Sequence, residues 1–278
     1  MEEKMLRKLK RRVTVLTAWT ALLSLLVLAL AGALLYEGIV YNLALSQLEK
    51  GNIEKTEALL SYVPDYKDAE EILSSLEYRK VGNVIIFGAY EQDANNDNGF
   101  EPLEWIVLDY DAENEKSLVI TKKCIEQIAY KEEYGKTTWA NSDARRLLNG
   151  RLVDLIFSGE EKARVLTTTV HTSANVKYGT DGGEDTEDRI FLLSDREFNK
   201  YLAGTENAIG YVTDYAAKRG VISGPISGTS MCWLRTPGES LVYVSTATYK
   251  GELNSMGIYS YSASCGVRPA MWISVSEP

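Results

Sequence analysis

Positions 13–36 form a run of 24 residues without a single Lys, Arg, Asp or Glu. An α-helix rises 1.5 Å per residue, so about 20 apolar residues cross the hydrocarbon core of a bilayer. Hydroxyl groups inside such a run can bond back to the helix backbone and are compatible with a span. The run holds four of these residues early on: Thr14, Thr17, Thr20 and Ser24. The sequence therefore predicts a transmembrane helix at residues 13–36, in contact with the lipid bilayer.

The charges on either side of this run predict its orientation. Residues 1–12 hold six basic residues against two acidic ones, a balance of +4, and the rest of the chain holds 24 basic against 37 acidic residues, a balance of −13. Positively charged flanks stay in the cytoplasm. We therefore expect a cytoplasmic tail at residues 1–12, a single-pass helix in the cell membrane, and an extracytoplasmic C-terminal part.

A cleaved secretory signal is the alternative interpretation of the same segment. The small residues Ala31, Gly32 and Ala33 resemble a cleavage site. Signal peptides have apolar cores of about 7–15 residues, whereas Val13 to Leu30 already spans 18. This length favours an uncleaved anchor, and both interpretations export the remainder.

The acidic balance of the exported part limits its partners. A domain with a balance of −13 repels the phosphates of nucleic acids and of anionic lipid headgroups. We therefore expect no nucleic acid partner.

Residues 37–79 predict a helical stalk. Leucines recur at helical spacing, Gly51-Asn52 interrupts the run, and Pro64 ends the second helix because it disfavours helical geometry at its predecessor. The pattern resembles one tetratricopeptide-like unit. A single such unit cannot bury its own apolar face, so we expect a juxtamembrane stalk that can self-associate.

Residues 81–278 change to short strands alternating with short helices. Capping boxes at Ser158–Glu161 and Ser194–Glu197 predict two helix starts. Strands at both ends with helices between them argue for an α+β domain rather than a doubly wound sheet. The strands are expected at 84–87, 105–108, 118–120, 190–193, 231–234, 241–245 and 267–273, with further helices at 142–148 (stopped by Asn149-Gly150) and 213–219.

The same region resembles a family of bacterial domains, domain of unknown function 6273, from about Val81 to Val275. The strongest matching stretches are Trp233-Leu-Arg-Thr-Pro-Gly238 and Gly266-Val-Arg-Pro-Ala-Met-Trp-Ile273. Further stretches are at 84–91, 101–108 and 185–194.

The final stretch also resembles the ending of C-type-lectin-like domains, including formylglycine-generating enzymes. This resemblance implies a C-type-lectin-like fold, in which the terminal strands meet in a central sheet below a loop-rich ligand face. It implies no particular activity, because one fold can carry many functions.

The three cysteines leave two interpretations open. Cys124, Cys232 and Cys265 form no metal-type spacing. In an oxidising compartment an odd count predicts one disulfide, for which Cys232 with Cys265 is the preferred pair. Three buried thiols are the equal alternative.

Residues 181–188 are the best candidate for binding a metal ion. Carboxylates interleaved with glycines offer the oxygen ligands that calcium prefers, so calcium is the one cofactor that the sequence suggests. The candidate ligands are Asp181, Glu184, Asp185 and Asp188. Their spacing matches no defined calcium loop, and a solvated acidic loop is the alternative.

The single histidine, His171, would have to serve any Ser-His-Asp or Cys-His centre. No nucleophile motif accompanies it, so we expect a half-exposed strand residue. Arg235 and Arg268 are expected to be buried donors to carbonyls or carboxylates.

Tyrosines gather near the C-terminus and suggest a ligand-binding surface. Tyr259 and Tyr261 alternate at strand period, which places both rings on one face. Tyr offers rigid contact area together with a hydroxyl group. The candidate ligand-binding residues are Tyr243, Asn254, Tyr259 and Tyr261.

The sequence thus favours a membrane-anchored, non-catalytic ligand-binding module for a glycan, a peptide or an envelope protein. Two alternatives remain. One is an extracytoplasmic enzyme, either related to formylglycine-generating enzymes or of another kind, and the other is a structural or sensory ectodomain.

Overall fold

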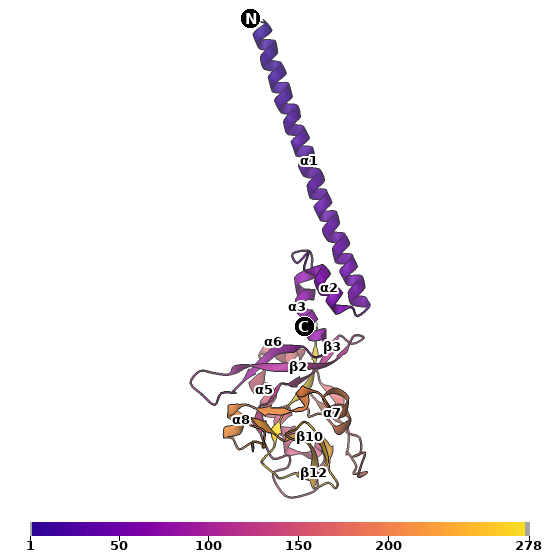
Figure 1. Ribbon diagram of the computed structural model, residues 1–278, viewed down its shortest axis with the longest axis vertical. Helices are drawn as coiled ribbons and strands as arrows, with labels where there is room; N and C mark the ends of the chain where they lie inside the picture. The colour runs from indigo at the N-terminus through magenta and orange to yellow at the C-terminus, as the bar shows by residue number, and fades with distance from the viewer. Residues whose placement is uncertain (1, 276–278) are drawn as a thin grey trace. The chain divides into compact units, whose positions relative to one another are not determined.

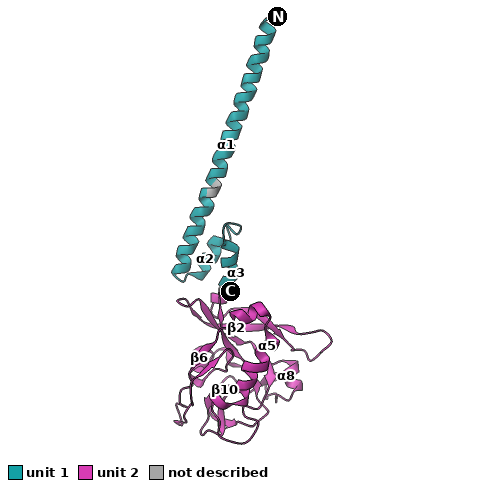
Figure 2. Cartoon of the chain, turned by 180° about the vertical axis from the view of Figure 1, so that it is seen from behind, with its two compact units in different colours: residues 1–76 teal, residues 77–278 magenta. Residues whose placement is uncertain are grey.

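The computed structural model describes residues 2–275, without the side chains of Ala33 and Leu34. The chain divides into two compact units, Met1–Leu76 and Glu77–Pro278 (Figure 2). Each unit has its own buried hydrophobic cluster.

The first unit begins with one long helix, α1 (Glu2–Glu49) (Figure 1). It is long and apolar enough to cross a membrane, and its most apolar window has no side chain buried by the protein. The hydroxyl groups within it bond back to the helix as predicted, for example Thr14 Oγ1 to Lys10 O at 2.9 Å and Ser24 Oγ to Thr20 O at 2.9 Å. No helix break separates the predicted span from the stalk that follows.

Two short helices complete this unit, α2 (Ile53–Leu60) and α3 (Ala69–Arg79). The first break falls at Gly51, whose φ of 72° suits a residue without a Cβ. Val40, Ala44 and Leu60 pack in one small buried cluster, which holds the end of α1 against α2. The tetratricopeptide-like and self-associating character of this segment stays a prediction.

The second unit is mixed α and β, which confirms the predicted α+β class. Its largest sheets have the strand orders β1-β2-β3-β14 and β12-β11-β10-β13-β5. Smaller sheets have the orders β4-β8-β9 and β6-β7. The strands are β1 (Val84–Tyr90), β2 (Glu101–Asp111), β3 (Lys116–Thr121), β4 (Lys123–Cys124), β5 (Glu126–Gln127), β6 (Thr168–Val170), β7 (Thr186–Asp188), β8 (Gly210–Val212), β9 (Thr229–Ser230), β10 (Cys232–Pro237), β11 (Tyr243–Ala247), β12 (Leu253–Tyr259), β13 (Gly266–Val267) and β14 (Ala270–Ser274).

Short helices connect these strands, and both predicted capping boxes are present. Ser158 begins α6 and Ser194 begins α7, each with its serine accepting from the backbone N–H of the glutamate three residues on. The helices of this unit are α4 (Asp143–Leu147), α5 (Val153–Ile156), α6 (Gly159–Arg164), α7 (Asp195–Tyr201) and α8 (Asp214–Lys218), with 3-10 turns η1 (Trp139–Asn141) and η3 (Glu206–Ala208) and a π-helical turn η2 (Leu148–Leu152).

Three sequence-based predictions are wrong in instructive ways. The predicted strand at 190–193 is only an isolated β-bridge between Phe191 and Ala270. The carbonyls of Leu192 and Leu193 accept hydrogen bonds from the side chain and the backbone N–H of Arg235 and are therefore not free to continue a strand ladder. The predicted strand at 267–273 is two strands in different sheets, β13 and β14, separated by Arg268-Pro269. The predicted helix stop at Asn149-Gly150 lies inside the π-helical turn η2.

Arg235 on β10 is the buried donor that the sequence predicts. Its guanidinium donates to the carbonyls of Leu192 at 2.7 Å and His171 at 2.9 Å, and it forms an ion pair with Glu197. Only 3% of the residue is exposed. Glu197 also completes the capping box of α7. The side chain of Arg235 therefore connects β10 to the start of α7 and to two loops.

Removing this guanidinium should be strongly destabilising. We expect Arg235→Ala to lower the free energy of unfolding by about 3–5 kcal/mol, because one partner of a buried ion pair is lost and two carbonyls lose their donor. Urea unfolding of the full chain in detergent micelles measures the change. Arg196→Ala on the exposed side of α7 is the matched control, and equal losses in the two variants would contradict the role of Arg235.

Asp195, at the first position of α7, is a second buried polar group. Its Oδ2 accepts from Ser245 Oγ at 3.2 Å, while its Oδ1 is buried without a hydrogen-bond partner. Burial raises the pKa of this carboxyl from 3.8 to about 6. The folded state therefore prefers the protonated acid.

This shift predicts a pH-dependent stability. A raised folded-state pKa contributes stability below about pH 4 that is lost as the pH rises through about 6. Between pH 4.5 and 7.5 we expect the wild-type chain to lose roughly 2 kcal/mol of unfolding free energy relative to Asp195→Asn, at 1.36 kcal/mol per pKa unit. Urea unfolding of both proteins at both pH values measures this difference, and parallel pH profiles would refute it.

Candidate functional site

Four tyrosine rings form a continuous exposed stack on the second unit. Tyr243 and Tyr259 lie opposite each other on β11 and β12, with ring centroids 4.5 Å apart and planes inclined by 27°. Tyr261 follows at 5.2 Å from Tyr259, and Tyr134 meets Tyr261 edge-on at 5.9 Å. Exposed fractions are 43% for Tyr259 and Tyr261 and 72% for Tyr134. We call these four residues the tyrosine stack.

A bulge in β12 sets the register of the stack. Asn254 pairs with Thr246 and Ile258 with Val244, so β12 has extra residues between these pairs. Gly257 occupies the bulge with φ 79°, and a Cβ built there would lie 2.4 Å from Val244 O. Only glycine fits this position, and the bulge brings Tyr259 opposite Tyr243.

Backbone hydrogen bonds fix the loop that carries Tyr134. Lys131 N donates to Ser260 O at 2.9 Å, and Thr137 N donates to Leu241 O at 2.8 Å. These bonds tie both ends of the loop to the segments that carry the other three rings. The stack is therefore held by rigid backbone.

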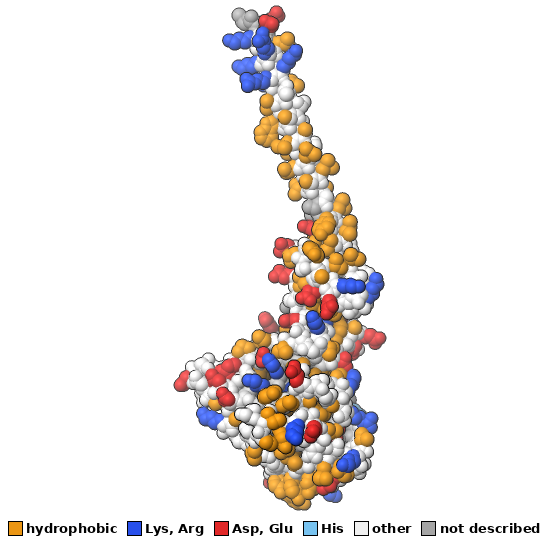
Figure 3. All heavy atoms as spheres, in the orientation of Figure 1, with side chains coloured by type: hydrophobic (Ala, Val, Ile, Leu, Met, Phe, Trp, Pro, Cys, Tyr) orange, Lys and Arg blue, Asp and Glu red, His pale blue; other side chains and the backbone are white. Residues whose placement is uncertain are grey.

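Tyr243 is the half-buried member of the stack and stays neutral. The hydrogen bond to Tyr259 raises the pKa of Tyr243 to about 12, so the phenol does not ionise near neutral pH. β12 is an edge strand of its sheet. Figure 3 shows apolar and aromatic side chains gathered at the end of the domain where β12 lies. The arrangement can offer flat ring area together with hydroxyl groups.

The structure brings Tyr243, Tyr259 and Tyr261 together but leaves Asn254 apart. Asn254 is at the other end of β12, where its Nδ2 donates to Thr246 Oγ1 at 3.4 Å and its Oδ1 accepts from Gly257 N at 3.3 Å. It supports the bulge rather than the ring surface. Tyr134 was absent from the sequence-based set, because nothing local connects it to rings more than a hundred positions away.

The acidic loop at 181–188 does not gather its carboxylates. Asp188 is buried and accepts from Trp139 Nε1 and Arg145 Nε, both at 2.7 Å. Asp185 contacts His171 Nδ1 at 2.6 Å, and Asp181 accepts from Gly183 N at 3.1 Å. Glu184 is exposed. Calcium binding at this loop stays a prediction.

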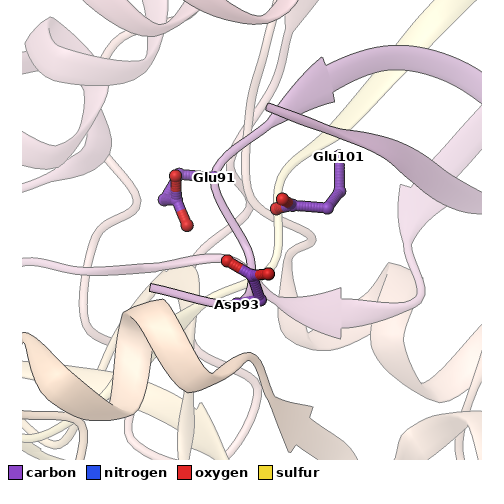
Figure 4. A group of neighbouring side chains, drawn as sticks. All are labelled: Glu91, Asp93 and Glu101. Atoms are coloured by element: carbon purple, nitrogen blue, oxygen red, sulfur yellow. The ribbon is translucent and has the colours of Figure 1, made fainter. Parts of the chain in front are cut away.

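A different group of carboxylates comes within range of a metal ion. Within the described part of the chain, Glu91, Asp93 and Glu101 each place an oxygen within 4.8 Å of the others (Figure 4). Local donors already satisfy them: Asn95 N donates to Asp93 at 2.8 Å, and Gln92 N donates to Glu101 at 2.7 Å. The hydrogen bond from Asn98 lowers the pKa of Asp93. These bonds explain the cluster without an ion, although such oxygens would also suit calcium.

The three cysteines are free and buried in the structure, and the pairing of Cys232 with Cys265 stays a prediction. A Cβ built on Gly210 would lie 2.2 Å from Cys232 Sγ and 3.1 Å from Cys124 Sγ. A Cβ on Gly266, the partner of Cys232 across the sheet, would lie 2.8 Å from Cys124 Sγ. The sulfur atoms of Cys124 and Cys232 therefore both lie close to Gly210.

His171 directly follows β6 and is not part of a strand, which differs from the predicted strand position. Its side chain is 66% exposed and its Nδ1 faces Asp185. Within residues 2–275 no hydroxyl or thiol is hydrogen-bonded to its ring.

The family follows from comparison with family models. A model described as "Domain of unknown function (DUF6273)" matches residues 114–275. The chain belongs to the DUF6273 family. Comparisons with curated proteins and with solved structures found no match.

The matched residues include the whole tyrosine stack but only part of the second unit. The match begins in the turn before β3, whereas the sequence suggested a start near Val81. β2 pairs with β3 and β1 pairs with β2, so both strands outside the match belong to the same sheet as the matched strands β3 and β14. All four rings of the tyrosine stack lie within the matched residues.

The bulge gives a direct test of how the stack is positioned. We expect Gly257→Ala to lower the melting temperature by at least several degrees, because the new Cβ would overlap Val244 O and the backbone conformation is strained for alanine. Gly99→Ala is the matched control, since Gly99 has φ 85° with nothing within 4 Å of its built Cβ. Similar melting temperatures for the two variants would show that the close contact does not constrain β12.

Proposed function

We propose that the chain is a single-pass membrane protein of the cell envelope whose DUF6273 domain is displayed outside the cytoplasm and binds a glycan or a peptide. The tyrosine stack carries this proposal. Exposed aromatic patches on soluble domains commonly mark binding sites. Tyr supplies large contact area for little loss of side-chain entropy, which is why it is enriched in binding surfaces.

A C-type-lectin-like fold is part of the proposal. Its support is the position of β14, the last strand, which lies beside β3 in the sheet that includes β1. The tyrosine stack then belongs to a face built from turns and loops, on residues 134 and 261, together with the edge strand β12.

The anchor and its flanking charges support display outside the cytoplasm. α1 has the length and hydropathy of a membrane span, and basic residues precede its uncharged stretch. A glycan or a peptide of the envelope would meet the domain in that location. The acidic domain would not repel these ligands as it repels a nucleic acid, because neither a glycan nor a peptide is a chain of phosphate groups.

The tyrosines should be necessary for ligand binding and dispensable for folding. We expect Tyr259→Ala combined with Tyr261→Ala to weaken binding about a hundredfold, as for loss of two hot-spot residues. The melting temperature should change little because both rings lie at the surface with 43% of each residue exposed. The measurement is binding of the full chain in detergent micelles to glycan and peptide arrays.

Tyr211→Ala provides the matched control, because Tyr211 on β8 is 47% exposed and lies outside the stack. This variant should bind the array hits of the wild type. Retained binding in the double variant would refute the proposal, and so would unfolding of that variant, since the rings would then be part of the core.

A further inference from the structure

A cavity of about 500 Å³ lies beside the tyrosine stack. Its volume falls within the range of small-molecule sites, about 300–1,000 Å³. Glu132 and Ala263 line the cavity, and each is two positions from a ring of the stack, Tyr134 and Tyr261. The loops at 130–137 and 260–264 therefore form part of both features.

Three arginines line this cavity, in a domain that is otherwise acidic. They are Arg146, Arg151 and Arg219, and the carboxylates in the lining are Glu132 and Asp143. The charged groups of the lining therefore sum to one positive charge. This local sign is opposite to the acidic balance of the exported part.

The backbone brings two of these arginines to the same cavity through an unusual turn. Arg146 is in α4 and Arg151 is in the π-helical turn η2. Residues five apart lie on different sides of an α-helix, whereas a π-helical turn closes its hydrogen bonds between residues five apart and brings them closer to one side. Such turns are rare and occur frequently at functional sites.

The arginines retain hydrogen-bonding capacity for a ligand. Within residues 2–275, Arg151 makes no ion pair or side-chain hydrogen bond, and its side chain is exposed. Arg219 pairs through Nε with Glu126 Oε1 at 2.6 Å. Within residues 2–275, neither of its terminal nitrogens is hydrogen-bonded. Arg146 pairs with Asp143 through one of its terminal nitrogens, with its side chain 75% exposed.

A buried carboxylate holds Arg219 in place. Glu126 is 4% exposed and also accepts from Tyr90 Oη at 2.7 Å and from Gln127 N at 2.9 Å. Because Glu126 engages Nε, the terminal guanidinium nitrogens are left for another acceptor. This arrangement prepares the bidentate geometry in which arginine binds carboxylates.

We propose that this arginine-lined cavity binds the carboxylate group of a ligand. Arg146 and Arg219 already pair with Asp143 and Glu126, so Arg151 is the lining guanidinium left without an ion pair within residues 2–275. A single carboxylate matches this one positive charge, whereas a phosphate dianion would exceed it and would face Glu132 and Asp143. The proposal deepens the proposed function, because a ligand stacked on Tyr261 could extend its carboxylate into the cavity. The carboxylate could belong to a peptide C-terminus or to a uronic acid.

The test uses ligand-observed saturation-transfer NMR on the full chain in detergent micelles. One arm compares acetyl-Ala-Ala with a free C-terminal carboxylate against its C-terminal amide. The other arm compares a digalacturonate with the corresponding neutral galactose disaccharide. Inorganic phosphate serves as the competing anion in both arms.

We expect the carboxylate member of at least one pair to bind about tenfold more tightly than its neutral partner, and the arm that responds identifies the source of the carboxylate. Arg151→Gln should abolish that preference without altering the melting temperature, because Arg151 has no partner to lose. Arg196→Gln, whose residue does not line the cavity, should retain it. Equal binding of both members in both arms, tighter binding of phosphate, or an unchanged preference in Arg151→Gln would each overturn the proposal.

The same measurements separate this proposal from the proposed function. If Tyr259→Ala combined with Tyr261→Ala keeps the carboxylate preference, the cavity acts alone and the role of the stack fails. If tyrosine-dependent binding shows no preference between carboxylate and neutral members, the stack stands and the cavity proposal fails.

Discussion

The buried guanidinium of Arg235 is the interaction on which the arrangement of the DUF6273 domain depends. A buried charge without partners would cost several kcal/mol, so the chain must bring acceptors to it. Those acceptors come from Leu192, His171 and Glu197, which places two loops and the start of α7 against β10. β11 pairs with β10, and β12 pairs with β11. The strands that carry the tyrosine stack are therefore positioned by the same strand that Arg235 anchors.

Local signals in the sequence predicted the local structure well. The capping boxes at Ser158 and Ser194 were predictable because the partners are three residues apart and the bonds need no tertiary contact. The β1-β2-β3 meander and the α+β class were predictable from apolar runs and turns. The apolar run of α1 was predictable for the same reason, since its length and lack of charge decide what it can cross.

Contacts that form only in the folded domain explain where the sequence-based predictions were wrong or incomplete. The stretch 267–273 has the composition of one strand, yet the side chain of Arg268 donates to the carbonyls of Thr121 and Asn207 and Pro269 has no N–H to continue a ladder. Tyr134 joins the stack, and Arg219 joins the cavity, only after the whole domain has folded. Two of the three stack tyrosines named from sequence are neighbours on or just after one strand, which is why they were found.

The net charge of the domain and the charge of its cavity act over different distances. At physiological ionic strength surface charges are screened beyond about 8 Å, so the acidic surface governs the approach of large polyanions. Inside the cavity the charged groups of the lining are three guanidiniums and the carboxylates of Glu132 and Asp143, and these act on a group within hydrogen-bonding distance. An acidic domain can therefore repel a nucleic acid and still hold one carboxylate.

A shallow stack of rings is a weak site by itself, because it excludes little water from its contacts. A membrane anchor changes this balance, since copies confined to one surface can engage a repetitive envelope ligand at several points. Linked binding of that kind can raise the overall affinity by about 10²–10⁴ without any new contact. The long apolar helix and the exposed rings are thus consistent with one another under the proposed function: anchored display would allow a module with modest intrinsic affinity to retain its ligand.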